Sequence, residues 1–403
     1  MDSDVRWGEQ HDSRTVNTRS RSRTLEITGG DVVTPTETIP NGSILITDGV
    51  IEHVDSGGPV VGDGIINATG KVVLPGLIDI HGDDIERHLE PRKGATVDSR
   101  RAIQAADRAN ILAGITTKLH AVAFEEANEE SRSIARANEI ARSIVETKTL
   151  IGDNRLHARC ELADDSETAV RKWINRGAVD LVSLINHAPG MGQYGDTQRF
   201  MERYTADGGL SEHSVNQLID KRKSVSTQLM KERGHRLQAI ALSHGIPVAS
   251  HDDESVEEVC DNARSGTTIS EFPVTMEAAS SAKEVGLTTI MGAPNLVRGA
   301  SLWDNISVRD AIEKGLVDIV CSDYHPPSLL AAPFIPTGEP LHERVARVSK
   351  NPADVLGLRR RGRIEPGARA DIIIIEQEPI PTIESVIING RQVFSTAGEN
   401  PRR

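Results

Sequence analysis

Residues that could bind a metal ion stand at the ends of short apolar runs in this chain. The first of these runs, 74–81, ends in His81, and Asp83 follows after a single glycine. Side chains two positions apart on a strand point to the same face, so this imidazole and this carboxylate would point the same way. Together they suit an ion such as Zn²⁺ or Mn²⁺. A His-x-Asp triplet also arises by chance, and alone it does not establish a site.

Four further runs end in the same kind of side chain, contributing Glu161, His187, His251 and Asp323. Six convergent ligands would suffice for two divalent ions bridged by one carboxylate. Burying so much negative charge without a cation would be very costly. We therefore predict a binuclear metal site built from His81, Asp83, Glu161, His187, His251 and Asp323.

Positively charged side chains gather near the same run ends. Three follow the first run, one lies on the third run and one follows the seventh. The arginine fork matches phosphate oxygens, and such a cluster on a chain of net charge −13 favours a polyanionic ligand. The substrate contacts that we expect are Arg87, Arg92, Lys93, Arg159, Asp252, Asn295, Arg298 and Tyr324.

The middle of the chain alternates strand-like apolar runs with helical stretches. The runs are 74–81, 114–124, 155–162, 178–187, 245–252, 268–274, 287–294 and 315–323. Helical spacing of apolar residues marks 98–112, 131–145 and 276–285. Eight strand–helix units predict a (β/α)8 TIM barrel, whose functional residues lie at the carboxyl ends of the strands. The polar, Gly-rich stretch 188–232 is interpreted as an insertion at the barrel mouth.

Both ends of the chain are rich in short β-like runs with turn signals such as Asp48-Gly49 and Asn389-Gly390. We expect the two ends to form one small β-sandwich domain over 25–73 and 361–397. The metal-dependent TIM-barrel domain would then span 74–360, preceded by a disordered tail at 1–24.

Composition narrows the class of protein. An acidic net charge of −13 disfavours a nucleic-acid partner, and no apolar run reaches the length of a membrane span, about 18–20 residues. Three cysteines in 403 residues give no disulfide framework, and residues 1–24 do not read as a secretory signal. We expect a cytoplasmic protein, for which a homo-oligomer remains open.

Some histidines are better explained by structural roles. His157 stands near the start of the third run, so we expect it at the stability face of the barrel, away from the mouth. His244 precedes a glycine at an expected helix end, which is a capping position. His120 lies on the second run but short of its end, and its role stays open.

Longer motifs resemble a known family. The segment 74–81 resembles the first barrel strand of the amidohydrolase superfamily, and 367–372 resembles the return into its β-sandwich. His81-Gly82-Asp83 stands where that superfamily usually has His-x-His. The motifs that narrow the match lie at 114–117, 157–162, 181–190, 249–253, 270–275, 291–295 and 322–324. Together they resemble the PhnM family, the α-D-ribose 1-methylphosphonate 5-triphosphate diphosphatases of the carbon–phosphorus lyase route, from about residue 25 to residue 394.

The resemblance implies that a phosphorylated sugar is hydrolysed to its 5-phosphate and pyrophosphate by a metal-bound hydroxide attacking the α-phosphorus. It implies the same six metal ligands, with Glu161 as the bridging carboxylate because no lysine ends the third or fourth run. Asp323 would orient and deprotonate the water. An Asn-His pair at a strand end could also contact substrate, so the ligand role of His187 stays open.

Two other functions remain open at this point. An amidohydrolase acting on a cyclic amide or an N-acetyl sugar would use the same barrel, but it would need fewer cations at the mouth. A non-catalytic scaffold would keep the barrel and lose the metals, and the intact set of ligand residues argues against it. Metal content and a panel of phosphate and amide substrates would separate these possibilities.

Overall fold

The structure is a computed structural model, and it describes residues 23–57, 62–127, 132–187, 197–202, 204–205, 210–301 and 305–396. Residues 1–22 lie outside the described residues, and with them most of the expected tail. Thr24, the last residue assigned to that tail, opens the first strand. Within the described residues, no helix is both long and apolar enough to span a membrane.

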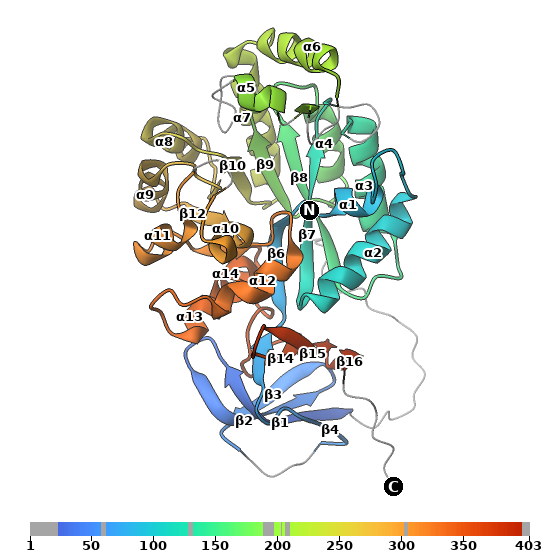
Figure 1. Cartoon of the computed structure of the whole chain (residues 1–403), viewed down its shortest axis with the longest axis vertical. Coiled ribbons are helices and arrows are strands. Elements are labelled where there is room, and N and C mark those ends of the chain that lie inside the picture. Colours follow the sequence, from blue (N-terminus) through green and yellow to red (C-terminus); the bar gives the residue numbers. More distant parts are fainter. Residues whose placement is uncertain are drawn as a thin grey trace, which may run out of the picture.

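The two ends of the chain together form one β domain, as the β-like runs predicted, and its strands are linked in one eight-stranded sheet. Its order is β16-β15-β14-β5-β1-β2-β3, with β4 beside β1. The strands are β1 (Thr24–Val33), β2 (Thr38–Thr47), β3 (Val50–Asp55), β4 (Gly64–Asn67), β5 (Val72–Pro75), β14 (Ile372–Glu376), β15 (Thr382–Ile388) and β16 (Arg391–Ser395). β5 and β14 pair across the two halves, so residues 72–75 lie beside 372–375. Figure 1 shows this sheet at one end of the molecule.

Two of its hairpins turn at the predicted dipeptides. Asp48 and Gly49 have φ of 49° and 85°, and Asn389 and Gly390 have φ of 50° and 71°. Positive φ at both central residues gives a turn whose twist matches that of the flanking strands. Asparagine, aspartate and glycine are the residues that adopt this conformation most readily.

Eight parallel strands form the predicted barrel. They are β6 (Leu77–Gly82), β7 (Ile115–Phe124), β8 (Asp153–Glu161), β9 (Leu181–Ile185), β10 (Val248–His251), β11 (Ile269–Glu271), β12 (Thr288–Gly292) and β13 (Ile319–Cys321). Each pairs with the next in sequence order. A parallel bridge between Gly82 and Asp323 joins the last strand to the first. Every strand except β8 adds an aliphatic side chain to one buried cluster inside the barrel.

Helices surround the barrel and begin where short polar residues cap them. Asp98, Ser133 and Thr275 each accept hydrogen bonds from backbone N–H groups in the first turn of the helix that follows. The helices are α1 (Ile85–Leu89), α2 (Ser99–Leu112), α3 (Ile134–Glu146), α4 (Glu167–Ile174), α5 (Thr197–Glu202), α6 (Glu212–Lys223), α7 (Thr227–Ser243), α8 (Val256–Arg264), α9 (Met276–Glu284), α10 (Ala293–Arg298), α11 (Val308–Glu313), α12 (Pro326–Ala331), α13 (Leu341–Ala346) and α14 (Lys350–Val355). They include the three predicted helices, with ends shifted by up to three residues.

The predicted insertion is shorter than 188–232. Helices α5 and α6 lie at the end of the molecule opposite the terminal sheet (Figure 1). They share a small apolar core that includes Phe200, Val215 and Leu218. Helix α7 instead packs against α4 in the ring around the barrel, so the insertion ends before Thr227. Residues 188–196 lie outside the described residues.

Candidate active site

The carboxyl ends of the barrel strands bring His81, His251 and Glu271 together. His81 Nδ1 lies 2.6 Å from Glu271 Oε1, and His251 Nε2 lies 3.8 Å from Glu271 Oε2. All three side chains are buried. Because one ring nitrogen of His81 faces a carboxylate, its other nitrogen is oriented for a second partner, an arrangement typical of histidines that bind metals.

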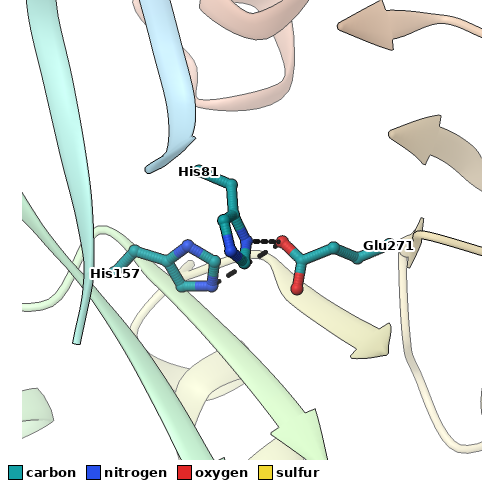
Figure 2. A group of neighbouring side chains, drawn as sticks. All are labelled: His81, His157 and Glu271. Carbon is teal, nitrogen blue, oxygen red and sulfur yellow. Dashed lines mark hydrogen bonds and ion pairs between the residues drawn. The ribbon is translucent and has the colours of Figure 1, made fainter. Parts of the chain in front are cut away.

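His157 joins this group, contrary to the sequence analysis. Figure 2 shows its ring beside His81 and Glu271. Its Nε2 lies 2.6 Å from Ser183 Oγ and 3.9 Å from Glu271 Oε1. The expectation that His157 lies at the stability face was wrong because β8 begins at Asp153, four residues before it. Polar residues at that start hid the true beginning of the strand. Burial lowers the pKa of His157 to about 3, which keeps the ring neutral.

A second group of ligand-type side chains surrounds His187. Its Nδ1 lies 3.7 Å from Glu161 Oε2, and its Nε2 lies 3.8 Å from Asp252 Oδ2. Asp252 Oδ2 is also 3.0 Å from His251 Nδ1. The Glu161 carboxylate accepts hydrogen bonds from the backbone N–H groups of Ala163 and His187, each at 3.0 Å. The two hydrogen bonds fix the carboxylate, and both rings lie beside it at one rim of the barrel.

Asp83 and Asp323 meet where the barrel closes. Asp83 donates its backbone N–H to the carbonyl of Asp323, and Asp323 donates its own to the carbonyl of His81, both at 3.0 Å. Arg159 Nη1 lies 3.7 Å from Asp83 Oδ2, and Arg159 Nη2 lies 3.3 Å from His251 Nε2. One arginine therefore stands between the two histidine groups and the closing strands.

Three clusters in the described part of the chain have the composition and spacing to hold a metal ion. They are His81, His157 and Glu271; His187, His251 and Asp252; and Glu125, Glu161 and His187. In each cluster the ligand atoms lie within 4.8 Å of one another. The clusters include four of the six predicted ligands; Asp83 and Asp323 lie beside them without belonging to one.

The side chains fit a bound cation in two further respects. Asp252 Oδ2 and His251 Nδ1 are buried, and among the described residues neither has a well-aligned hydrogen-bond partner. Burial raises the pKa of Glu161 to about 7, and burial together with nearby Asp83 raises that of Asp323 to about 7. A divalent ion would favour the charged form of both carboxylates.

Backbone strain is concentrated at these strand ends. Asp252, Phe272 and Asp323 have φ of 59°, 56° and 54°, in the left-handed region. Each stands one or two residues after a barrel strand. Such a conformation costs about 1–3 kcal/mol per residue and recurs at active sites, where the surrounding structure enforces it.

The residues predicted to contact substrate lie farther apart from one another than the predicted metal ligands do. The Arg87 guanidinium lies 5.6 Å from the centroid of the Tyr324 ring, near the closing strands. Asn295 is half-buried on α10, and Arg298 is exposed at the end of that helix. Arg92 and Lys93 are exposed in the loop after α1. Of the predicted cations in the described residues, Arg159 is the one recorded beside the histidines.

Several charged residues near the site were missed from the sequence. Glu271 ends β11, three residues before the end of the run 268–274, so the strand-end rule missed it because that run was drawn too long. Glu125 directly follows β7, whose end at Phe124 matches the run 114–124, and the rule extended by one residue would have found it. Lys118 is buried on β7, and its Nζ lies 2.5 Å from Asp79 Oδ2 and 2.8 Å from Asp84 Oδ1. A lysine inside an apolar strand was the available signal, since a buried charge requires partners.

Comparisons with known proteins agree with this architecture. Residues 322–394 match the model of the Amidohydrolase family. The α-D-ribose 1-methylphosphonate 5-triphosphate diphosphatase of Escherichia coli (strain K12) is 32% identical over 82% of this chain and 90% of its own length. The 5-methylthioadenosine/S-adenosylhomocysteine deaminase of Halobacterium salinarum is 21% identical over 88% of this chain and 84% of its own.

Solved structures share the fold at low sequence identity. A Xaa-Pro dipeptidase with bound methionine aligns with a TM-score of 0.64 and 16% identity, over 92% of this chain and 99% of that chain. A D-hydantoinase aligns with a TM-score of 0.56 and 15% identity, over 92% and 95%. Because the E. coli enzyme is matched at 32% identity over most of both chains, this chain belongs to the amidohydrolase superfamily and, within it, to the family of α-D-ribose 1-methylphosphonate 5-triphosphate diphosphatases.

Proposed function

We propose that this chain hydrolyses α-D-ribose 1-methylphosphonate 5-triphosphate to the 5-phosphate and pyrophosphate, in phosphonate catabolism. The similarity to the E. coli enzyme over 90% of its length is the observation that carries the proposal. The buried histidines and carboxylates at the strand ends support it, because hydrolysis of a phosphoanhydride needs an activated water and stabilisation of developing negative charge.

The proposed metal ligands are those predicted from the sequence: His81, Asp83, Glu161, His187, His251 and Asp323. Two ions, Zn²⁺ or Mn²⁺, fit this number of nitrogen and oxygen donors. When bound, such ions would acidify a water molecule and offset charge on the attacked phosphoryl group. Glu161 is the proposed bridging carboxylate, and the N–H groups of Ala163 and His187, which each donate to one of its oxygens, fix its orientation.

Asp323 is the proposed general base for the attacking water. In the metal-free chain, burial and nearby Asp83 raise its pKa to about 7, so this carboxylate accepts a proton more readily than an ordinary aspartate. Hydrogen bonds with His81 and Asp83 hold the backbone of Asp323 at the end of β6, and this fixes the position of the Cα atom from which its side chain extends. The chain thereby positions the base without help from a mobile loop.

Arg159 is the proposed principal phosphate contact. It is largely buried, its Nε has no hydrogen-bond partner among the described residues, and its nearest carboxylate is 3.7 Å away. A guanidinium with unsatisfied donors suits phosphate oxygens. The remaining proposed contacts are Arg87, Arg92, Lys93, Asp252, Asn295, Arg298 and Tyr324.

The same proposal covers the whole chain. We propose a sandwich domain over 25–73 and 361–397 that carries the hydrolase barrel of 74–360. A cytoplasmic location would suit a phosphorylated sugar substrate, and a homo-oligomer is compatible with this activity.

The test is turnover by the purified full-length protein together with metal analysis of the same preparation. We expect pyrophosphate and the 5-phosphate in equal amounts, with activity lost on chelation and restored by Zn²⁺ or Mn²⁺. A hydantoin and an N-acetyl sugar phosphate serve as competing substrates. Release of orthophosphate in place of pyrophosphate, or turnover of the amides alone, would refute the proposal.

A further inference from the structure

The insertion helix α6 carries a fully buried arginine to the edge of the site. Arg222 lies in the last turn of α6, and its side chain is 0% exposed. Its Nη1 donates to the backbone carbonyl of His187 at 3.1 Å and lies 3.8 Å from Glu161 Oε2. The guanidinium thus touches the backbone of one proposed metal ligand and faces the carboxylate of another.

The other side of the same guanidinium is anchored in the barrel. Arg222 Nη2 donates to Glu125 Oε2 at 2.8 Å and to Asp164 Oδ2 at 3.1 Å. The second oxygen of Glu125 accepts from Arg132 Nη1 at 3.2 Å. Removing one partner from such a buried ionic group is strongly destabilising, because it leaves a charge without compensation.

The aromatic residues of the insertion hold the arginine in this pose. The Arg222 guanidinium lies 5.9 Å from the centroids of both the Phe200 and Tyr204 rings, and its Nη1 donates to the Tyr204 hydroxyl at 3.3 Å. Contact with an aromatic face and several hydrogen bonds leave the guanidinium little freedom. The Arg222 guanidinium is therefore a rigid contact between the insertion and the strand ends.

We propose that Arg222 is a positioning residue for the metal ligands. Its guanidinium lies against the Glu161 carboxylate and fixes the backbone of His187, so that α6 completes the site from outside the barrel. The inference rests on the proposed function insofar as Glu161 and His187 are taken as ligands. It assigns to the insertion a role in metal affinity that the barrel alone would not have.

Arg233 provides a matched control. It lies on α7, and its Nη1 donates to the backbone carbonyl of Leu162 at 2.8 Å, next to Glu161 in sequence. Its Nη2 lies 3.8 Å from Asp165, which is 86% exposed. Arg233 thus donates to a backbone carbonyl at the end of β8, as Arg222 donates to one after the neighbouring strand β9, but no contact of Arg233 with a proposed ligand is found among the described residues.

The experiment compares R222Q and R233Q in the full-length protein. Zn²⁺ affinity is measured by competition with a chromophoric chelator, and circular dichroism reports the fold. Loss of an outer contact to a metal ligand typically weakens binding about 10–100-fold, which is the result expected for R222Q. R233Q should stay within about threefold of the wild type. Millimolar guanidinium should restore much of the affinity of R222A and leave that of R233A unchanged.

The outcomes separate the positioning role from the activity. Wild-type affinity in R222Q, or equal losses in R222Q and R233Q, would overturn the positioning role even if the triphosphate is hydrolysed. A weakened R222Q in a protein that does not hydrolyse the triphosphate would support the positioning role and refute the proposed substrate. If R222Q does not fold, R222K replaces it, because lysine keeps the positive charge but loses the paired N–H donors of the guanidinium. Wild-type Zn²⁺ affinity in R222K would also count against the proposal.

Discussion

At the scale of single residues, Asp323 combines three features that act together. It is held in the left-handed region with φ 54°, it is buried, and it faces Asp83. Burial and the neighbouring carboxylate each disfavour its charge, so a bound cation or a transferred proton relieves the same cost. Asp323, to which we assign proton transfer, is therefore subject both to backbone strain and to repulsion from a neighbouring carboxylate.

Asp323→Asn should lower kcat by about 10²–10⁴, the usual contribution of a general base. The amide keeps the shape and one possible ligand oxygen but loses the charge and most of the basicity. KM for the triphosphate should change much less, because the phosphates are held mainly by cations. Pyrophosphate release and metal content are measured on the same preparation. Near-normal turnover would remove Asp323 from the mechanism, and loss of metal with activity would leave the base role unproven.

Arg159→Ala should raise KM for the triphosphate about 10–100-fold with metal content unchanged, since a charge-assisted hydrogen bond contributes about 1.5–3 kcal/mol. We expect Arg92→Ala and Arg298→Ala to raise KM for the triphosphate as well, but by a smaller factor, because both side chains are exposed. Arg236→Ala is the control, as this arginine pairs with Glu167 on the outside of the barrel. An unchanged KM in Arg159→Ala would contradict the assignment.

At the scale of elements, the seam between β6 and β13 depends on a buried lysine. Lys118 on β7 pairs with Asp79 and Asp84, and its Nζ donates to Ser322 Oγ at 3.0 Å. Asp79 in turn accepts the backbone N–H of Ser322 at 2.9 Å, which links the first strand to the last. The glycine of His81-Gly82-Asp83 gives this lysine its space: a Cβ at Gly82 would lie 1.8 Å from Lys118 Nζ.

Gly82→Ala should therefore destabilise the protein by about 3–5 kcal/mol, because Lys118 would have to leave its buried partners. The free energy of unfolding in urea, measured on metal-free protein, checks this. Gly234→Ala is the control: its Cβ would meet Leu162 and Leu184 at 3.6 Å, an ordinary contact, and alanine favours the helix. Equal free energies of unfolding for the two variants would show that Lys118 can move away from residue 82 at little cost, which would contradict the prediction.

The elements were predictable from sequence where burial dictates a single pattern. Parallel strands buried on both faces read as continuous apolar runs, and these located all eight barrel strands. Polar residues at the start of β8 break that pattern, and so the beginning of this strand and the place of His157 were misjudged. Arg222 could not be assigned at all, because its partners Glu125 and Asp164 come from distant strand ends that only the folded chain brings together.

At the scale of the whole molecule, buried histidines couple stability to pH. The folded pKa of His157 is about 3 and that of His187 about 4, both lowered by burial from 6.5. Below pH 6.5 these histidines become protonated in the unfolded chain but stay neutral in the folded chain. The free energy of unfolding therefore falls as pH falls. The loss continues until the pH reaches the folded pKa values.

His157→Gln should make the metal-free protein less sensitive to acid between pH 6.5 and pH 4. Each buried neutral histidine contributes a slope of up to about 1.4 kcal/mol per pH unit in that window, and this variant removes one of them. Urea unfolding at pH 8, where His157 is neutral in both states, provides the baseline difference between the two proteins. A stability difference that does not change between pH 8 and pH 5 would argue against a neutral, buried His157.

The closure of the barrel also bears on how the protein is made. Asp79 and Ser322, which are bonded across the seam, are 243 positions apart in the sequence. A nascent chain on the ribosome exposes His81 and Asp83 long before Asp323 is synthesised. A nascent chain that ends before Asp323 cannot offer the complete set of proposed ligands. Acquisition of metal would then follow translation of the last barrel strand, and a loaded centre would mark a chain whose barrel can close.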